Sequence, residues 1–447
     1  MIYDLCLHIG ATPEAIQFFI KIKDAFNQKN ITVQLFTVNT EVSDFVDEKH
    51  LKDIIVLPKI KEQYNIEESI QFVKSLGFFN YSSLYRTQKI FHDLSDKDGQ
   101  ILTAKKIEAV KGILHLPKAK KYMTFAGDEI DLNMFRVYAK AQGGKIYFSG
   151  ITNLNNRVFI TDSEERFFNI PKEIESIPES EKDWIEKYIH NIIEKRPILW
   201  ADPKERDVHF KGIWILKLIK RISYKSDSTK TTKFIIQRFI SRVKNRFLSK
   251  NHYCNTSVLD EKPFFYMPMH YPKDSQLTLR GLPFLNQADI IDIVSRFIPT
   301  EYNLIIKEHP HARGFSKVKD IKRISQLDRT KIIHPFVNSH EIMKKANAII
   351  VINSSVGFEA LLYNKAVITL GKSFFRGHGL TLDVNSLYDI EAAIEQAETF
   401  QPNRQKLEQF IYKIKKYSLD VNYTDLFNSN EEVINTYVEE IINKLEF

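Results

Sequence analysis

The sequence has 447 residues but only two cysteines, Cys6 and Cys254, which lie far apart in the chain. Two isolated cysteines supply neither a zinc site of the usual spacing nor a disulfide framework, so a reducing cytoplasm is the expected compartment. Long apolar runs are also lacking, and no membrane-spanning helix is expected. The N-terminal residues MIYDLCLHIG carry no basic leader, which argues against a signal peptide.

Asp-x-Asp pairs and His/Cys clusters are missing from the segments that carry the candidate site described below. We therefore expect neither a bound metal nor a cofactor. Internal repeats, low-complexity tracts and motifs for binding nucleic acid are lacking as well. The composition, with 43% hydrophobic and 27% charged residues, is that of a folded globular protein long enough for two domains.

Apolar strand-like runs alternate with stretches of helical periodicity in both halves of the chain. The runs in the first half lie at 2–10, 31–39, 53–60, 121–129 and 144–150, and those in the second half at 264–270, 302–308, 331–335, 347–353 and 366–372. Such alternation predicts α/β domains with parallel sheets, here two Rossmann-like domains. We assign them to 1–190 and 258–400, with a helical linker at 191–257 and C-terminal helices at 401–447 that could cross back to the first domain.

The most informative segment runs from Lys307 to Gly371, because polar motifs follow two of these runs. Lys307, Glu308, His309 and Pro310 end or follow the run at 302–308, and Asn353, Ser354 and Ser355 end or follow the run at 347–353. In an open parallel sheet, ligands bind outside the carboxyl ends of the strands. The helix expected from Val356 would add free N–H groups and a positive dipole end, so the sequence predicts a phosphate site.

Ser354, Ser355 and Glu359 allow two interpretations. Glu359, placed in the first turn of the expected helix, could accept hydrogen bonds from a ribose diol. Alternatively, Ser354 or Ser355 with Glu359 could simply cap the helix.

Three further residues are candidates for catalysis. Asp274, with His270 four residues earlier, follows the run at 264–270 and could act as a base or a nucleophile, or could be an ordinary turn residue. Asp128 follows YMTFAG (122–127) and could act as a base on the acceptor side. A helix cap formed by Asp128 or Asp131 is the alternative.

Positive charge is concentrated between Lys204 and Lys250, where fourteen Lys and Arg residues face three acidic residues. Apolar residues recur there at helical spacing, which predicts two basic amphipathic helices separated by a polar hinge at 223–232. This segment could lie on an anionic membrane surface or serve only as an interdomain linker, and nucleic acid is the least favoured partner.

Three stretches, PFFYMPMHYPKDSQLTLRG, KEHPHARG and VINSSVGFEALLYNKAVITLGKSFF, resemble the capsule polysaccharide biosynthesis family of bacterial glycosyltransferases, which includes Kdo transferases. The resemblance implies a GT-B-like fold in which two Rossmann-like domains face each other across a cleft. It also implies contacts of Lys307, His309, Pro310, Ser354 and Ser355 with the nucleotide of a sugar donor, CMP-linked rather than UDP-linked. Many members have Gln where this chain has His270, which leaves the sugar open.

The resemblance implies a metal-independent glycosyltransferase that transfers a sugar, such as Kdo, to a lipid-linked or growing capsular polysaccharide. Its expected location is the inner face of the cytoplasmic membrane, where a capsule assembly or export complex is a further expected partner. Two alternatives are a nucleotide-sugar epimerase of the same architecture and a non-catalytic protein of capsule assembly or export.

Overall fold

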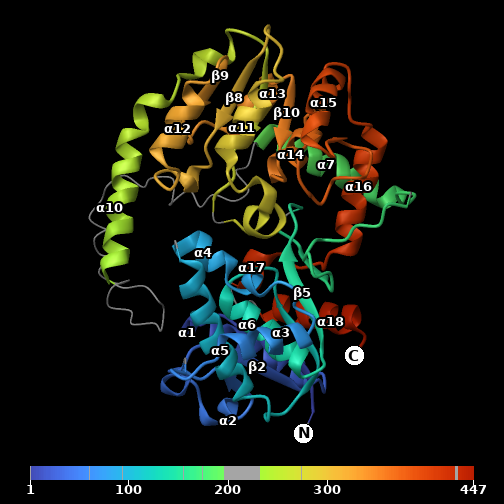
Figure 1. Cartoon of the computed structure of the whole chain (residues 1–447). Coiled ribbons are helices and arrows are strands. Elements are labelled where there is room, and N and C mark those ends of the chain that lie inside the picture. The colour runs from blue at the N-terminus through green and yellow to red at the C-terminus, as the bar shows by residue number, and fades with distance from the viewer. Residues whose placement is uncertain are drawn as a thin grey trace. The chain divides into compact units, whose positions relative to one another are not determined.

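The structure is a computed structural model of the chain (Figure 1). It describes residues 2–59, 61–92, 94–154, 156–173, 175–195, 232–272, 274–427 and 431–447. The first of the two expected basic helices and nearly all of the polar hinge lie outside these residues. The chain forms two compact units, Met1–Ile170 with Lys413–Phe447, and Pro171–Tyr412.

A six-stranded sheet forms the centre of the first unit, in the order β3-β2-β1-β4-β5-β6. All neighbours in it are parallel except β6, which runs antiparallel to β5. The strands are β1 (Tyr3–His8), β2 (Val33–Thr37), β3 (Ile54–Val56), β4 (Ala119–Phe125), β5 (Lys145–Ile151) and β6 (Val158–Thr161). This strand order is that of the doubly wound Rossmann fold.

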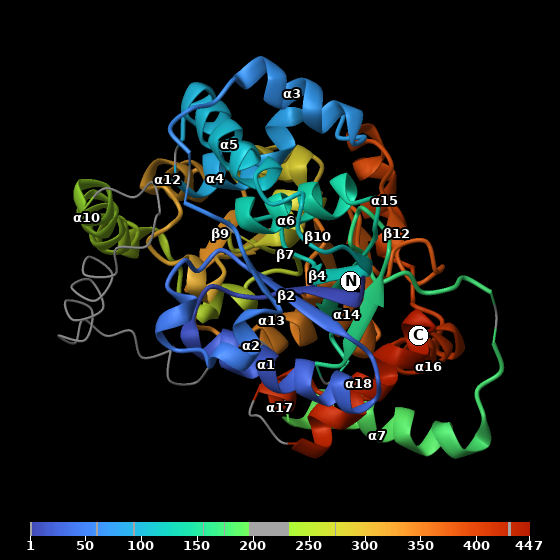
Figure 2. The same cartoon turned by 90° about the horizontal axis from the view of Figure 1, so that it is seen from below.

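Helices cover both faces of this sheet, with α1 and α18 on one face and α3, α5 and α6 on the other (Figure 2). The helices of the first unit are α1 (Pro13–Gln28), α2 (Glu48–Leu51), α3 (Ile66–Ser75), α4 (Arg86–His92), α5 (Asp96–Lys111), α6 (Ile130–Ala141), α17 (Tyr423–Phe427) and α18 (Glu431–Leu445). Successive strand residues point to opposite faces. Leu7 therefore belongs to the same core cluster as Ile441 of α18, whereas Cys6 belongs to that of Phe135.

The C-terminal residues return to the first unit and extend the edge of its sheet. The Leu419 N–H donates to the Val158 carbonyl at 2.7 Å, and the Val158 N–H donates to the Val421 carbonyl at 3.2 Å. The Arg157 guanidinium forms an ion pair with Asp420. Helix α18 then packs against α1. The first unit is thus built from both ends of the chain.

The second sheet has the order β12-β11-β10-β7-β8-β9, and all its neighbours are parallel. Its strands are β7 (Phe264–Pro268), β8 (Asn303–Lys307), β9 (Thr330–Ile333), β10 (Ala348–Val351), β11 (Ala366–Thr369) and β12 (Leu382–Asp383). Every residue of β7, β8, β10 and β11 is buried. Helices cover parallel sheets on both faces, which is why these strands read as continuous apolar runs in the sequence.

The helices of the second unit follow the predicted alternation with its strands. They are α7 (Glu179–Lys195), α10 (Thr232–Leu248), α11 (Gln287–Ser295), α12 (Val318–Ser325), α13 (Ser339–Lys345), α14 (Ser355–Leu362), α15 (Ile390–Ala397) and α16 (Arg404–Tyr417), the last of which runs across the boundary between the units. The prediction of two Rossmann-like domains is confirmed.

The boundary after the first domain differs from the predicted division at residue 190. The second unit begins at Pro171, because α7 packs against α14 and the Tyr363 hydroxyl donates to the Ile193 carbonyl at 3.4 Å. Sequence periodicity carries no information on which sheet a helix at this position covers.

Each sheet has one place where the strand order reverses, between β1 and β4 in the first unit and between β7 and β10 in the second. Loops that leave two such neighbouring strands diverge to opposite sides of the sheet. The carboxyl edge at the reversal is therefore the usual place for a ligand in an open α/β sheet.

The docking of α18 predicts a large contribution of the C-terminus to stability. Ile441 is fully buried in the core between α18 and α1. We expect Ile441→Ala to lower the free energy of unfolding by about 2–5 kcal/mol, because the substitution leaves a cavity. Urea unfolding measures the effect, with exposed Asn443→Ala as the control. Equal stability of the two variants would contradict the observed packing.

Candidate functional site

The predicted site residues of the second half gather at the carboxyl edge of the second sheet, around the reversal between β7 and β10. His270 and Asp274 lie in the loop after β7, and Asn353 lies in the loop after β10. Lys307 ends β8, whose carboxyl end lies beside that of β7. The parallel pairing of three strands thus brings together groups from three separate segments of the sequence.

A short π-helix, Gln276–Arg280, follows the β7 loop and joins the two sides of the reversal. The Asn353 side-chain amide donates to the Gln276 carbonyl at 2.7 Å. Burial lowers the pKa of the Arg280 guanidinium to about 10, against the opposing effect of Asp274. π-Helical turns occur frequently at functional sites. Sequence reasoning missed Gln276 and Arg280, because no periodicity marks a π-helix of five residues.

Asp274 lies in a turn, as one of the two interpretations of the sequence predicted. Its carboxylate accepts a hydrogen bond from the Gln276 backbone N–H at 2.9 Å. The same carboxylate also acts electrostatically on His270 and Arg280. Its catalytic role stays a prediction, since a turn contact leaves lone pairs on both oxygens for other partners.

Two buried polar atoms at the reversal have no hydrogen-bond partner among the described residues: His270 Nε2 and Asn353 Oδ1. The His270 backbone is fixed by Gln287, whose side chain accepts from the His270 N–H at 2.7 Å and donates to its carbonyl at 3.2 Å. Burial lowers the pKa of the His270 imidazole to about 4. Because buried polar groups nearly always have partners, these two atoms are expected to bind a polar ligand or an ordered water.

His309 begins a 3₁₀ turn, and its Nδ1 accepts a hydrogen bond from the His311 N–H at 3.2 Å. Burial lowers the pKa of this imidazole to about 3, and His311, Lys307 and His270 act in the same direction. The ring is therefore neutral at physiological pH. Since Nδ1 accepts, the proton of the neutral ring is on Nε2, which makes Nε2–H a hydrogen-bond donor.

Lys307 is buried, and its ammonium group donates to the Ser339 hydroxyl at 3.0 Å. Burial lowers its pKa to about 8, against the opposing effect of Glu359. Burial raises the pKa of Glu359 to about 8, against the opposing effect of Lys307. The Glu359 carboxylate also lies 3.7 Å from His340 Nε2. Sequence reasoning missed Ser339 and His340, which begin α13 and whose roles depend on the packing of α13 beside β8.

The structure corrects the expected position of Glu359. Helix α14 begins at Ser355, so Glu359 lies in its second turn and forms no capping box. Ser354 is the N-cap, and its hydroxyl accepts from the Val356 N–H at 3.3 Å. The capping interpretation is therefore confirmed for Ser354 alone. Glu359 is buried beside His340, and a contact of Glu359 with ribose stays a prediction.

Glu308 and Pro310 contribute to the site in different ways. The Tyr253 hydroxyl donates to the buried Glu308 carboxylate at 2.5 Å, so Glu308 ties the loop to the segment after α10. Burial raises the pKa of the Glu308 carboxyl. Pro310 starts the 3₁₀ turn, where it needs no N–H. Direct nucleotide contacts of both residues stay predictions.

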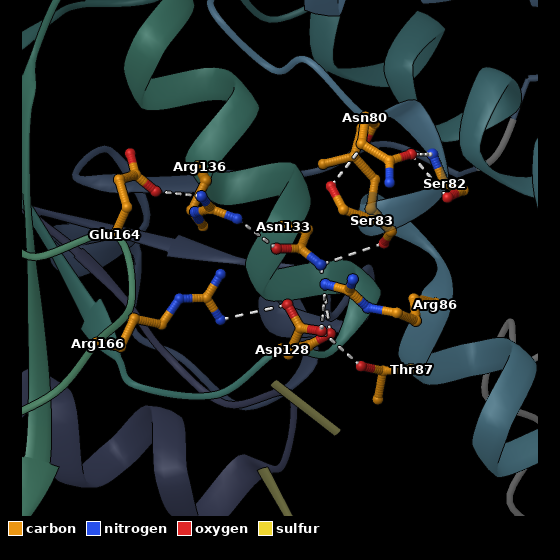
Figure 3. A network of polar contacts seen from close by, with 11 residues as sticks. Asn80, Ser82, Ser83, Arg86, Thr87, Asp128, Asn133, Arg136, Glu164 and Arg166 are labelled. Atoms are coloured by element: carbon orange, nitrogen blue, oxygen red, sulfur yellow. Dashed lines mark hydrogen bonds and ion pairs between the residues drawn. The ribbon is translucent and has the colours of Figure 1, made fainter. Parts of the chain in front are cut away.

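Asp128 lies in the first unit, in the loop after β4, at the reversal between β1 and β4. Its buried carboxylate accepts from the Thr87 hydroxyl at 2.9 Å and pairs with Arg166 at 3.4 Å and Arg86 at 4.0 Å (Figure 3). The N-cap of α6 is Glu129, so the capping interpretation of Asp128 and Asp131 is wrong. Asp128 instead joins three segments, and its function as a base stays a prediction.

The described residues contain no group of three or more His, Cys, Asp and Glu side chains placed to hold a metal ion. The described helices also include none that combines the length and the apolar character needed to cross a bilayer. The expectation of metal-independent chemistry stays a prediction.

Residues 219–415 match the family model described as capsule polysaccharide biosynthesis protein. The matched range contains all the site residues of the second unit, from His270 to Glu359. The match confirms, for this part of the chain, the resemblance recognised in the sequence.

Three curated proteins are similar to parts of the chain. Protein FixF of Sinorhizobium fredii is 33% identical over 133 residues, which cover 29% of this chain and 32% of that protein. The capsule polysaccharide modification protein LipB of Neisseria meningitidis is 25% identical over 189 residues, 40% of this chain and 39% of LipB. The capsule polysaccharide export protein KpsS of Escherichia coli is 35% identical over 92 residues, 20% of this chain and 23% of KpsS. The chain thus spans well under half the length of each.

Solved structures show weaker similarity. The beta Kdo 2,7 transferase of Thermosulfurimonas dismutans KpsC aligns with a TM-score of 0.35 and 17% identity, over 83% of this chain and 98% of that chain. A structure of S. aureus MnaA with UDP aligns with a TM-score of 0.30 and 14% identity, over 100% of this chain and 97% of that chain. TM-scores of this size carry no conclusion on activity.

The raised pKa of Glu359 predicts a specific pH dependence of stability. Between the ordinary value of 4.5 and the folded value of about 8, the folded protein keeps a proton that the unfolded chain has released. The free energy of unfolding therefore falls as the pH rises through this window. Glu359→Gln removes this pH-dependent loss. We therefore expect the free energy of unfolding of the variant, relative to that of the wild type, to rise by up to about 1.4 kcal/mol per pH unit.

Urea unfolding of the wild type and Glu359→Gln across this pH window measures the difference. Glu391→Gln, at an exposed position of α15, is the matched control. A wild-type-to-variant difference that does not change with pH would show that Glu359 is ionised in the folded protein.

Proposed function

We propose that this protein is a glycosyltransferase that moves a sugar from a nucleotide donor to a lipid-linked or growing capsular polysaccharide. The observation that carries the proposal is the pair of partnerless buried atoms, His270 Nε2 and Asn353 Oδ1, at the strand reversal of the second sheet. Lys307 and His309 flank them with donors. A polar, partly anionic ligand such as a sugar nucleotide satisfies these groups, and the capsule family match supports the acceptor class.

The leaving nucleotide carries developing negative charge on its phosphate. In this proposal, the neutral His309 donates from Nε2 to a phosphate oxygen, the Lys307 ammonium adds positive charge, and the first-turn N–H groups of α14 point at the same anion. Preorganised donors of this kind stabilise the transition state without rearranging when charge develops. The pKa of about 8 for Lys307 leaves most of this side chain charged at neutral pH.

The same proposal assigns the reacting sugar to the region of His270 and Asp274. Asp274 serves there as a base toward an acceptor hydroxyl or as a nucleophile at the anomeric carbon. In this proposal, Asp128 of the first unit is the base on the acceptor side. The donor we favour is CMP-linked, with an acidic sugar such as Kdo.

His309→Ala tests the proposed function directly. We expect it to lower transfer by at least two orders of magnitude, because loss of one preorganised donor costs about 3 kcal/mol in the transition state. The assay measures nucleotide release from CMP-linked and UDP-linked sugars, with and without a capsular acceptor. His252→Ala, which changes a histidine of the same unit that hydrogen-bonds Ser325, is the control. Near-normal turnover of His309→Ala would remove this residue from the mechanism.

The same assay separates the alternative functions. An epimerase converts the nucleotide sugar in the absence of any acceptor, whereas the proposed transferase requires one. A non-catalytic capsule assembly or export protein releases no nucleotide under either condition.

We further propose that the protein acts in the cytoplasm, at the inner face of the membrane, held there by the basic segment from 204 to 250. Each cation near an anionic surface contributes about 1 kcal/mol. Sedimentation with vesicles that contain acidic lipid should therefore be strong and should fall as salt screens the charges.

Replacing Lys217, Lys220, Arg221, Lys244 and Lys250 with Gln should abolish sedimentation with anionic vesicles. Transfer to a water-soluble acceptor analogue should be retained, because the candidate site residues lie elsewhere in the sequence. Normal sedimentation of this folded variant would leave the segment with a linker function only.

A further inference from the structure

Helix α10 has two faces of different character. Phe239, Arg242 and Arg246 follow helical spacing along one face and, with Ser249 just after the helix, are partly or fully buried. Residues Ile236, Ile240, Lys244 and Phe247 follow the same spacing along the other face and are exposed. We refer to these two sets as the inner and the outer face.

The inner face holds the loop that follows His309. The Arg242 guanidinium lies over the Phe315 ring, 3.7 Å from its centroid. The Asn245 side-chain amide donates to the Gly314 carbonyl at 3.3 Å. Gly314 has a φ of +83°, and a Cβ at this position would lie 2.6 Å from the Arg242 carbonyl oxygen. The contact of loop and helix backbones therefore requires glycine.

Contacts continue from this loop to the candidate site. The Phe315 and Tyr271 rings meet edge-on, with their centroids 5.5 Å apart. The centroids of the Tyr271 and His309 rings are 6.2 Å apart. A second connection runs through Tyr253, just after α10, whose hydroxyl donates to Glu308. The helix thus supports both neighbours of the candidate donor site, the loop after β7 and the loop after β8.

The outer face is apolar and basic. Ile236, Ile240, Phe247 and Leu248 are 39%, 58%, 66% and 50% exposed, and Lys244 and Lys250 are exposed beside them. The sequence from Thr232 to Lys250 contains no acidic residue. Apolar side chains flanked by cations alone complement an anionic lipid surface, where the apolar groups enter the acyl boundary and the cations meet phosphate headgroups.

We propose that α10 couples the binding of an anionic lipid surface to the binding of nucleotide at the candidate donor site. This inference rests on the proposed function, since it concerns the regulation of the same site. Lipid bound to the outer face reduces the motion of the helix. The contacts of the inner face then reduce the motion of the loop that carries His309. A nucleotide that binds an already ordered loop loses less conformational entropy, so the two ligands favour each other.

Thermodynamic linkage makes the coupling reciprocal. If lipid raises the nucleotide affinity by some factor, nucleotide must raise the affinity for lipid by the same factor. Couplings of this type typically reach 5- to 150-fold, and we expect at least a fivefold effect. Agreement of two independent measurements therefore provides an internal check.

The experiment titrates CMP into the full-length protein by calorimetry, without vesicles, with phosphatidylcholine vesicles, and with vesicles containing phosphatidylglycerol. We expect the Kd for CMP to fall at least fivefold with the anionic vesicles only. Vesicle sedimentation with and without CMP should show the matching increase. A Kd for CMP that anionic vesicles leave unchanged, although they bind the protein, overturns the coupling and leaves the proposed function intact. Absence of CMP binding under all conditions refutes the proposed CMP donor and the coupling together.

Two variants separate the faces of the helix. Arg242→Lys keeps the charge but removes the planar stack on Phe315, so vesicles should bind normally and the shift in Kd should disappear. Lys244→Gln with Lys250→Gln should weaken vesicle binding and leave the CMP affinity in the absence of lipid unchanged. Phe315→Leu repeats the first test from the loop side, and thermal unfolding checks that each variant is folded. Retention of the full shift in both Arg242→Lys and Phe315→Leu overturns the route through the inner face.

Discussion

The parallel pairing of β7 with β10 is the constraint on which the candidate site depends. These strands are far apart in the sequence, yet their pairing places the ends of two oppositely wound halves side by side. No crossover connection covers the edge at such a reversal. The Asn353–Gln276 hydrogen bond then fixes the distance between the two loops. Every functional group discussed for the second unit is positioned relative to this pair of strands.

Burial gives these groups their chemical character. Two histidines that would titrate near neutral pH in water remain neutral, with pKa values of about 4 for His270 and about 3 for His309. A buried lysine and a buried glutamate are both shifted to a pKa of about 8. A site of this type presents donors and acceptors with little net charge of its own. Such a site is suited to a negatively charged ligand, because its fixed hydrogen-bond donors replace the water molecules that would otherwise stabilise the charge.

Helix α10 of the basic segment makes specific contacts with the loop that follows His309, which a simple linker would not need. In a purely connecting helix, the residues that face the domain need only be apolar. Helix α10 instead presents Arg242 and Asn245 to the loop beyond His309, and Gly314 is required by the close approach of the two backbones. The part of the chain with the greatest positive charge is therefore also part of the support of the candidate donor site.

The sequence determined much of this architecture by itself. Apolar runs such as NLIIK and AIIV specified buried parallel strands. The polar residues that end or follow these runs identified Lys307, His309, Asn353 and Ser354 as site candidates, because a polar group at the end of a buried strand lies at the sheet edge. Capping at Ser354 or Ser355 was one of two interpretations of the sequence, and the structure assigns it to Ser354. These features depend on residues that are close together in the sequence, so local sequence patterns predict them.

Only the tertiary structure decided the rest. Some features arise from segments that meet only after folding. They are the unpaired buried atoms of His270 and Asn353, the burial of Glu359 near Lys307 and His340, and the π-helix at Gln276–Arg280. The sequence left Asp128 open between a base on the acceptor side and a helix cap, whereas the fold surrounds it with Thr87, Arg86 and Arg166 from other segments. Local patterns fix which elements form, but burial and pairing between distant segments fix what each side chain can do.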